Sequence, residues 1–265
     1  MIQLSQILGF YPPILRNDPS SRKYLLKEYI QLLILDYLAT TKHIGKLVFI
    51  GGTCLRLVKG IDRFSEDLDF DCKDFSADDF LLMTNNVITY LNRFGLKAEA
   101  RDKTSEKITA FRRNIYFPGL LQQMNLSGHP DERFLIKIEC QDQQVPYNSE
   151  MTFIRGCGFF FPIPVPPDPV LCSMKISALL SRQKGRDFYD LMFLLSFTRP
   201  DYNFLAARKQ IKDPSELKQA LTEMLAHTDL KKKSRDFEHL LFQKTNNLRI
   251  LNFPETLETI RYGKS

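Results

Sequence analysis

The stretch from Lys46 to Asp71, KLVFIGGTCLRLVKGIDRFSEDLDFD, contains the pattern that decides the fold. Its first five residues form a short apolar run, which predicts a buried strand. Gly51 and Gly52 then turn the chain, and the following residues predict a short helix that ends at Gly60. The segment LDFDC at 68–72 alternates apolar residues with acidic ones, which is typical of a second strand.

Asp67 and Asp69 are the candidate catalytic carboxylates. They are two residues apart, so their side chains point to the same face of a strand. Two carboxylates this close repel each other and suit a divalent cation with oxygen ligands. An EF-hand loop begins with a similar spacing, but Cys72 stands where that loop needs glycine. The structural alternative is a strand with one solvated face.

The glycine turn adds a second indication of chemistry. A turn that opens a helix directly after a strand lets backbone N–H groups approach a phosphate closely. Gly51 and Gly52 supply this turn, and Thr53 supplies a hydroxyl that binds phosphate or caps the helix. Arg56 and Arg63 are candidate phosphate contacts, although surface arginines usually have no such role.

The rest of the chain predicts an α+β protein. Helical spacing occurs at 22–38 and 77–94, the latter with Ser76 as N-cap, and strand candidates lie at 96–101, 106–117 and 134–141. The segment FPIPVPPDP at 161–169 holds five prolines, which excludes a regular helix or a central strand and marks a boundary. Beyond it the pattern is helical, at 170–183, 186–197, 215–227, 234–244 and 254–262.

Composition excludes several classes of protein. The chain has 265 residues, a formal net charge of +6 and five cysteines without a CxxC motif. The odd cysteine count indicates buried thiols in a reducing cytosol rather than a disulfide framework. The N-terminus lacks the order of a signal peptide, and no apolar run is long enough to span a membrane. The basic balance favours polyanionic partners such as nucleic acid.

The segments GGTCLRL and RFSEDLDFD together resemble the signature of the DNA polymerase β-like nucleotidyltransferase superfamily, a glycine turn followed by DxD. More narrowly they resemble the AbiEii/AbiGii toxin family, whose members typically read GGT-x-L and then R-x-S-x-D-L-D-F. The matching positions are Gly51, Gly52, Thr53, Leu55, Arg63, Ser65, Asp67, Leu68, Asp69 and Phe70. The resemblance implies a nucleotidyltransferase core with a mixed sheet at 1–160. A helical C-terminal lobe at 161–265 then completes the active-site cleft.

The resemblance also implies roles for residues outside this signature. The superfamily often adds a third carboxylate from a neighbouring strand, and Glu139 is the candidate, unless it pairs with Lys137. The family carries a K-x6-R motif followed by R/K-D-x-x-D, matched here by Lys175, Arg182, Arg186, Asp187 and Asp190. Lys175 is expected at the triphosphate and Asp190 at the edge of the site. Asp187 is a candidate partner for Arg182 or Lys184.

The resulting hypothesis assigns three sets of residues. The catalytic set is Asp67, Asp69, Lys175 and Asp190. The nucleotide-binding set is Gly51, Gly52, Thr53, Ser65, Arg63, Lys175 and Arg182. The metal-binding set is Asp67, Asp69 and Glu139, for Mg²⁺ or Mn²⁺.

By the same resemblance, the protein is expected to transfer NMP from an NTP to an RNA acceptor. The tRNA 3′ end is the expected acceptor, as in the MenT-type tRNA nucleotidyltransferase toxins, so that translation is blocked. A cognate antitoxin protein is the expected partner, and the cytoplasm is the expected location. The alternatives are nucleotidylation of a protein hydroxyl, transfer of the γ-phosphate, and an inactive binding module.

A basic block follows in the C-terminal part. The segment DLKKKSRDF places Lys231, Lys232, Lys233 and Arg235 within five residues. Such a block suits the backbone of an RNA, but we favour a solvated loop.

Overall fold

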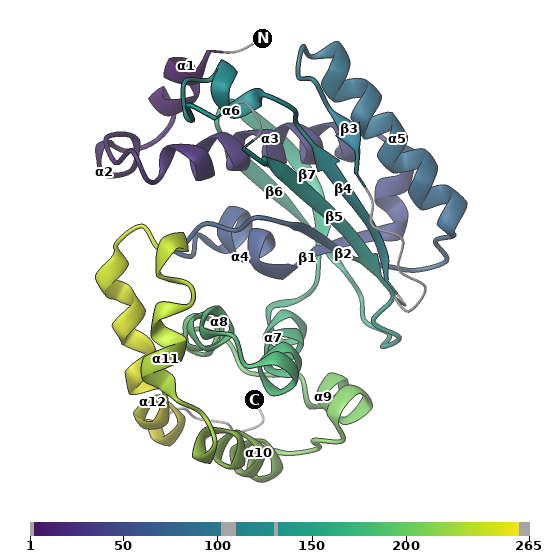
Figure 1. Cartoon of the computed structure of the whole chain (residues 1–265). Helices are drawn as coiled ribbons and strands as arrows, with labels where there is room; N and C mark the ends of the chain where they lie inside the picture. The colour runs from purple at the N-terminus through teal and green to yellow at the C-terminus, as the bar shows by residue number, and fades with distance from the viewer. Residues whose placement is uncertain (1–2, 102–109, 130–131, 260–265) are drawn as a thin grey trace. The chain divides into compact units, whose positions relative to one another are not determined.

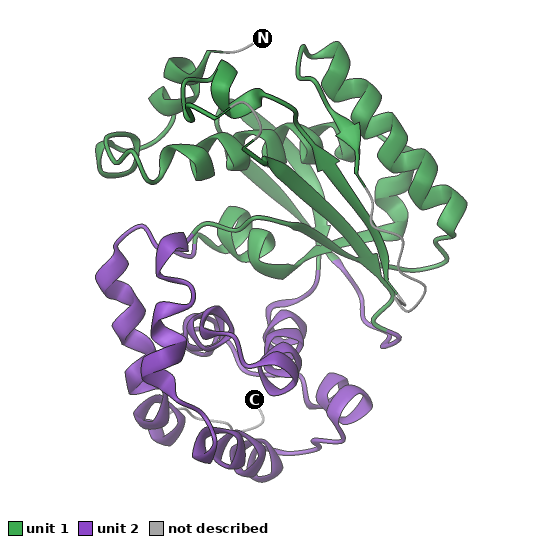
Figure 2. Cartoon of the chain, in the orientation of Figure 1, with its two compact units in different colours: residues 1–60, 64–143, 150–165 green, residues 61–63, 144–149, 166–265 purple. Residues whose placement is uncertain are grey.

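The computed structural model describes residues 3–101, 110–129 and 132–259 of the chain. It divides into two compact units, coloured separately in Figure 2. Unit 1 comprises residues 1–60, 64–143 and 150–165, and unit 2 comprises residues 61–63, 144–149 and 166–265. The expected α+β class is confirmed. Among the described residues, no helix is both long enough and apolar enough to cross a membrane.

Unit 1 consists of a mixed sheet, a separate hairpin and the helices around them (Figure 1). Its helices are α1 (Leu4–Gly9), α2 (Pro13–Arg16), α3 (Arg22–Ala39), η1 (Lys42–Lys46), α4 (Gly51–Lys59), α5 (Ala77–Arg93) and α6 (Leu120–Gln123). Its strands are β1 (Leu47–Ile50), β2 (Leu68–Cys72), β3 (Glu99–Ala100), β4 (Phe111–Tyr116), β5 (Leu135–Gln141), β6 (Glu150–Gly156) and β7 (Phe159–Val165).

The main sheet has the strand order β1–β2–β5–β4–β3. Strand β2 runs parallel to β5, whereas the other neighbours are antiparallel, so the predicted mixed sheet is confirmed. Strand β2 keeps its predicted alternation, with Leu68 and Phe70 buried in the core. Asp71 is buried as well, and its carboxylate accepts a hydrogen bond from the backbone N–H of Gln143 at 2.9 Å. Asp71 therefore has a structural role.

Helix α5 begins as the sequence predicts. The Ser76 hydroxyl accepts a hydrogen bond from the N–H of Asp79 at 3.0 Å, and the Asp79 carboxylate accepts one from the N–H of Ser76. This reciprocal capping satisfies two backbone donors that the first turn leaves without partners. Helix α3 packs against both α5 and β7 and so contributes most of its length to the core.

The proline-rich segment is partly a strand. Strand β7 includes Pro162 and Pro164 and pairs in antiparallel fashion with β6, forming a hairpin separate from the main sheet. Strand β7 forms backbone hydrogen bonds to another strand on one side only. Proline has no backbone N–H group, and on the other side of β7 this absence removes no hydrogen bond between strands. The prolines exclude a central strand, as expected, but not an edge strand, and neither β6 nor β7 was predicted.

Unit 2 is helical. Its helices are α7 (Asp168–Arg182), α8 (Gly185–Leu195), α9 (Tyr202–Lys209), α10 (Pro214–Ala226), α11 (Leu230–Arg235), η2 (Glu238–Leu240), η3 (Lys244–Asn252) and α12 (Phe253–Thr259). Residues 144–149 join this unit because Val145 packs in a small core with Val170 and Phe204.

The single helix predicted at 234–244 is wrong, because α11 ends at Arg235 and two short 3₁₀ helices follow. Residues 106–109 of a predicted strand and 260–262 of the last predicted helix lie outside the described residues.

Candidate active site

Strands β2 and β5 bring together three carboxylates, which we call the carboxylate face: Asp67, Asp69 and Glu139. The parallel register places Asp69 opposite Glu139, and Asp67 lies two residues before Asp69. Lys137 precedes Glu139 by two residues, so both side chains leave β5 on the same face. Strand pairing therefore also brings Lys137 next to Asp67, although the two residues are far apart in the sequence.

The ammonium of Lys137 lies between these carboxylates. Its Nζ is 3.2 Å from Oδ2 of Asp67 and 3.3 Å from Oε2 of Glu139. From β4, the Arg112 guanidinium contacts the same Glu139 oxygen at 2.7 Å. The positive charge that three close carboxylates require is thus supplied by the protein itself.

These contacts shift the ionisation of the groups. Burial alone would lower the pKa of Lys137, but the carboxylates of Asp67, Glu139 and Asp69 outweigh burial and raise it. Burial alone would raise the pKa of Glu139, but Lys137 and Arg112 outweigh it and lower that pKa. Lys137 and Glu139 are therefore both charged at neutral pH.

The glycine turn lies directly against the carboxylate face. Strand β1 ends at Ile50, opposite Asp69, and α4 begins at Gly51 with a φ of +81°. A Cβ on Gly51 would lie 2.9 Å from Cβ of Asp69 and closer still to its carboxylate. Only glycine fits here, because the space that a side chain would need is occupied by Asp69.

Thr53 connects the first turn of α4 to the strand that carries the aspartates. Its buried hydroxyl donates a hydrogen bond to the backbone carbonyl of Asp67. It is not the N-cap, since that position is Ile50 and no side chain caps the helix. Thr53 thus fixes the N-terminal turn of α4 relative to the carboxylate face.

Ser65 lies in the segment that leads into the carboxylate face. Its carbonyl accepts a hydrogen bond from the side-chain amide of Gln31 at 3.2 Å. Its neighbour Glu66 pairs with Lys27 of α3 at 2.9 Å. Helix α3 therefore holds this segment in place, and the predicted contact of Ser65 with nucleotide stays a prediction.

The carboxylate oxygens of Asp67, Asp69 and Glu139 are of the type that suits a divalent cation. Asp67 and Asp69 offer the hard oxygen donors that such a cation prefers. Glu139 is engaged by Arg112 and Lys137. Within residues 3–101, 110–129 and 132–259, no group of three or more His, Cys, Asp or Glu side chains is arranged to hold a metal. A third ligand role for Glu139 stays a prediction.

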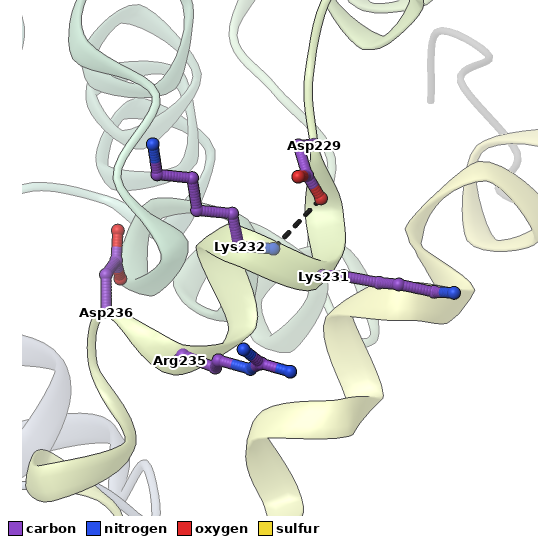
Figure 3. Close-up of a pocket in the computed structure, with 5 residues that line it drawn as sticks. All are labelled: Asp229, Lys231, Lys232, Arg235 and Asp236. Atoms are coloured by element: carbon purple, nitrogen blue, oxygen red, sulfur yellow. Dashed lines mark hydrogen bonds between the residues drawn. The ribbon is translucent and has the colours of Figure 1, made fainter.

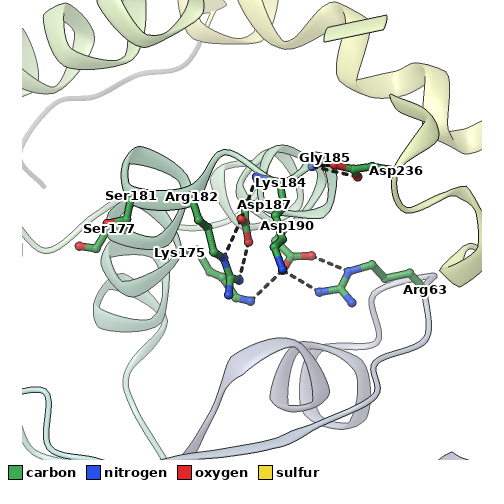
Figure 4. Close-up of polar contacts among 10 residues, drawn as sticks. All are labelled: Arg63, Lys175, Ser177, Ser181, Arg182, Lys184, Gly185, Asp187, Asp190 and Asp236. Atoms are coloured by element: carbon green, nitrogen blue, oxygen red, sulfur yellow. Dashed lines mark hydrogen bonds and ion pairs between the residues drawn. The ribbon is translucent and has the colours of Figure 1, made fainter. Parts of the chain in front are cut away.

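Unit 2 contains a second charged cluster, centred on Asp190 of α8 (Figure 4). The Arg63 guanidinium donates two parallel hydrogen bonds to the Asp190 carboxylate, both at 2.6 Å. The Lys175 ammonium of α7 donates a third at 2.8 Å. Arg63 is 1% exposed and Asp190 is fully buried, so Arg63 acts first as a support for Asp190.

The two cations determine the charge state of Asp190. Burial alone would raise the pKa of this carboxyl, but Arg63 and Lys175 outweigh burial and lower it to about 2. Removing one partner from such a buried cluster leaves charge uncompensated, which typically costs about 3–5 kcal/mol. The predicted contacts of Lys175 and Arg63 with a triphosphate stay predictions.

Arg182 is paired in the same unit. Its Nε and Nη2 atoms donate to the two oxygens of Asp187 at 2.9 and 2.7 Å, and the Asp187 carboxylate also accepts from the N–H of Lys184. The expected partnership of Asp187 is thus confirmed. Helix α7 ends at Arg182 and α8 begins at Gly185, so Arg182 and Lys175 lie on one helix and Arg186 on the next.

Two polar centres were not predicted from the sequence. One is the contact of Lys137 with Asp67, since the sequence had suggested Lys137 as a partner of Glu139 alone. The other is Asp62, whose carboxylate accepts from the Tyr189 hydroxyl at 2.7 Å, the Asn246 amide at 3.0 Å and Arg249 at 3.3 Å. The partners of Asp62 are more than 100 residues away in the chain, so no local pattern could have identified them.

The sequence matches a known family over most of its length. The model of the family described as Nucleotidyl transferase AbiEii toxin, Type IV TA system, matches residues 33–257. No curated protein sequence matches the chain.

Two solved structures share the fold. JHP933 from Helicobacter pylori is 20% identical, with a TM-score of 0.54, over 89% of this chain and 90% of that one. MenT4, a nucleotidyltransferase toxin from Mycobacterium tuberculosis H37Rv, is 16% identical, with a TM-score of 0.52, over 97% and 99% of the two chains. At these identities the likeness concerns the fold.

A Gly51→Ala substitution is predicted to displace Asp69. The control is Gly60→Ala, because Gly60 has a similar φ of +76° but open space around its Cβ position. The control should lose about 1–2 kcal/mol of the free energy of unfolding, from the left-handed backbone alone. Gly51→Ala should lose clearly more in urea unfolding. Equal losses would contradict the close packing of Gly51 on Asp69.

The pH dependence of stability is predicted to change in Asp190→Asn. Because the pKa of Asp190 is lowered from 3.8 to about 2, its stabilising effect is complete above about pH 4 and is lost as the pH falls towards 2. The variant should lack this part of the pH dependence and be less stable at pH 7. Unfolding measured from pH 2 to 7, with the exposed Asp78→Asn as control, tests this. Parallel curves for wild type and Asp190→Asn would contradict it.

Proposed function

The chain belongs to the AbiEii nucleotidyltransferase toxin family, and from this premise we propose that it transfers NMP from an NTP to an RNA acceptor, the 3′ end of tRNA. The observation that carries the proposal is the carboxylate pair Asp67 and Asp69 beside the N-terminal turn of α4. Family members use an NTP and a divalent metal, for which we propose Mg²⁺.

Each part of the arrangement supports one step of this reaction. The backbone N–H groups in the first turn of α4 suit phosphate oxygens, and the absence of a side chain on Gly51 lets this turn lie against Asp69. Asp67 and Asp69 are the residues that would hold the divalent cation. When bound, such a cation supplies positive charge against the triphosphate and lowers the pKa of an attacking hydroxyl.

The chain itself contributes positioning and charge. The acceptor hydroxyl loses its proton to solvent as its oxygen forms a bond to the α-phosphorus. The bond between the α-phosphorus and the oxygen that bridges to the β-phosphorus breaks, and pyrophosphate leaves with that oxygen. The protein needs no covalent intermediate, because positioning and electrostatic stabilisation supply most of the catalysis of this type of transfer. Lys137 keeps the carboxylates fixed while these groups assemble.

Addition of a nucleotide to the tRNA 3′ end would prevent aminoacylation and block translation, which accounts for toxicity. A cognate antitoxin is the partner that this function requires, and the cytoplasm, where tRNA and NTPs occur, is the expected location. The net charge of +6 is compatible with a polyanionic acceptor.

The labelling test uses purified protein, Mg²⁺, total tRNA and each of the four α-³²P-labelled NTPs. Wild type should label tRNA with at least one NTP. Asp67→Asn and Asp69→Asn should each lower the rate by at least about 100-fold, because each loses a charge that acts in the transition state. Asp78→Asn, an exposed aspartate of α5, is the matched control and should keep the wild-type rate.

The other outcomes identify the alternatives. Label on protein alone would replace the RNA acceptor by a protein hydroxyl. Label transferred only from γ-³²P-NTP would indicate a phosphotransferase. Absence of label with any nucleotide, in a protein that also fails to bind Mg²⁺–NTP, would indicate an inactive binding module.

A further inference from the structure

Unit 2 has a basic pocket on α11, shown in Figure 3 and lined by Asp229, Lys231, Lys232, Arg235 and Asp236. Its volume is about 540 Å³. The predicted solvated loop is wrong here, because the basic block forms a short helix. The three cations are exposed, so the pocket is open to a ligand from solvent.

The two acidic residues of the basic pocket are held by backbone donors. Asp229 caps α11, its carboxylate accepting from the N–H of Lys232 at 3.0 Å. Both oxygens of Asp236 accept from the N–H of Gly185, at 3.1 and 3.0 Å. Gly185 has no room for a side chain, since a Cβ would collide with the carbonyl of Lys233. Both carboxylates therefore serve to hold α11 in its fold.

The cations of the basic pocket have no such task. Within the described parts of the chain, the side chains of Lys231, Lys232 and Arg235 make no hydrogen bond or ion pair. Figure 3 shows Lys231 and Arg235 extending to the same side of α11, one helical turn apart. On this surface the carboxylates accept hydrogen bonds from the backbone, and the cationic side chains remain available to a ligand. Such a surface has the chemistry of an anion-binding site.

The size and openness of the pocket favour a polymer over a single small anion. Cations one turn apart can contact successive phosphates of one strand, and exposed lysine and arginine bind phosphate backbones without reading the base sequence. An acidic protein surface offers carboxylates of irregular spacing, which three flexible cations match less well than a repeating phosphate chain.

We propose that Lys231, Lys232 and Arg235 bind the phosphate backbone of the RNA acceptor. The inference rests on the proposed function for the identity of the RNA, but it concerns a separate property, binding without chemistry. It gives a role to three cations that form no hydrogen bond or ion pair with the described residues. Binding through the pocket is independent of sequence and weakens as salt rises.

The test measures binding of fluorescently labelled deacylated tRNA to the full chain by polarisation, without NTP, at 50, 100 and 200 mM KCl. The pocket variant is Lys231→Gln/Lys232→Gln/Arg235→Gln. It should bind at least about tenfold more weakly at 50 mM KCl, and the slope of log K against log salt should fall by about two to three, close to one per lost phosphate contact. Its thermal unfolding should match wild type, since these exposed side chains have no partner to lose.

The control removes the same charge elsewhere, from three exposed cations whose side chains form no hydrogen bond or ion pair with the described residues: Arg93→Gln/Lys97→Gln/Lys212→Gln. The control should bind tRNA within about twofold of wild type. Wild-type binding by the pocket variant, or equal weakening in the control, would overturn the proposal. Displacement of tRNA by poly-L-glutamate at equal charge would also overturn it and assign the pocket to an acidic protein partner.

The proposal and the proposed function can fail separately. Asp67→Asn/Asp69→Asn removes the reaction but should leave tRNA binding at the wild-type affinity. If wild type binds tRNA through the basic pocket and yet transfers no nucleotide, the proposed function is wrong, whereas the proposal that the pocket binds RNA is supported. If the pocket variant labels tRNA at the wild-type rate with subsaturating tRNA, the pocket proposal fails and the function stands.

Discussion

The ammonium of Lys137 between Asp67 and Glu139 is the interaction on which the candidate site depends. Parallel pairing of β2 with β5 forces Asp69 and Glu139 into register, and three carboxylates at this spacing would repel each other without a cation. Lys137 and Arg112 supply two positive charges against three negative ones, so one negative charge remains. This negative charge among the named groups is compatible with the proposed divalent cation.

The cluster in unit 2 also brings opposite charges together, but there the positive charges outnumber the negative charge. Asp190 is fully buried and lies between Arg63 and Lys175, two positive charges against one negative charge. The excess positive charge agrees with the phosphate role expected of Lys175. The Asp190 carboxylate also explains how the charged Arg63 side chain can be buried, since it offers the guanidinium a bidentate partner.

Local sequence patterns predicted the parts of the fold that depend on local forces. The alternation of Leu68 and Phe70 with acidic residues predicted which face of β2 is buried, and Ser76 predicted the start of α5. The hairpin β6–β7 was missed because prolines are compatible with a strand that has a free edge. The pairing of Lys137 with Glu139 was foreseen as an alternative, because the two residues lie on one strand. The contact of Lys137 with Asp67 and the partners of Asp62 were missed, because they depend on strand register and on contacts between distant segments.

We propose that Asp67 and Asp69 together bind a divalent cation. Electron paramagnetic resonance of Mn²⁺ titrated with protein, with and without a non-hydrolysable NTP, measures this directly. Wild type should reduce the signal of free Mn²⁺, more strongly with the nucleotide present, and Asp67→Asn/Asp69→Asn should leave that signal unchanged. Equal Mn²⁺ binding by wild type and the double variant would contradict the claim.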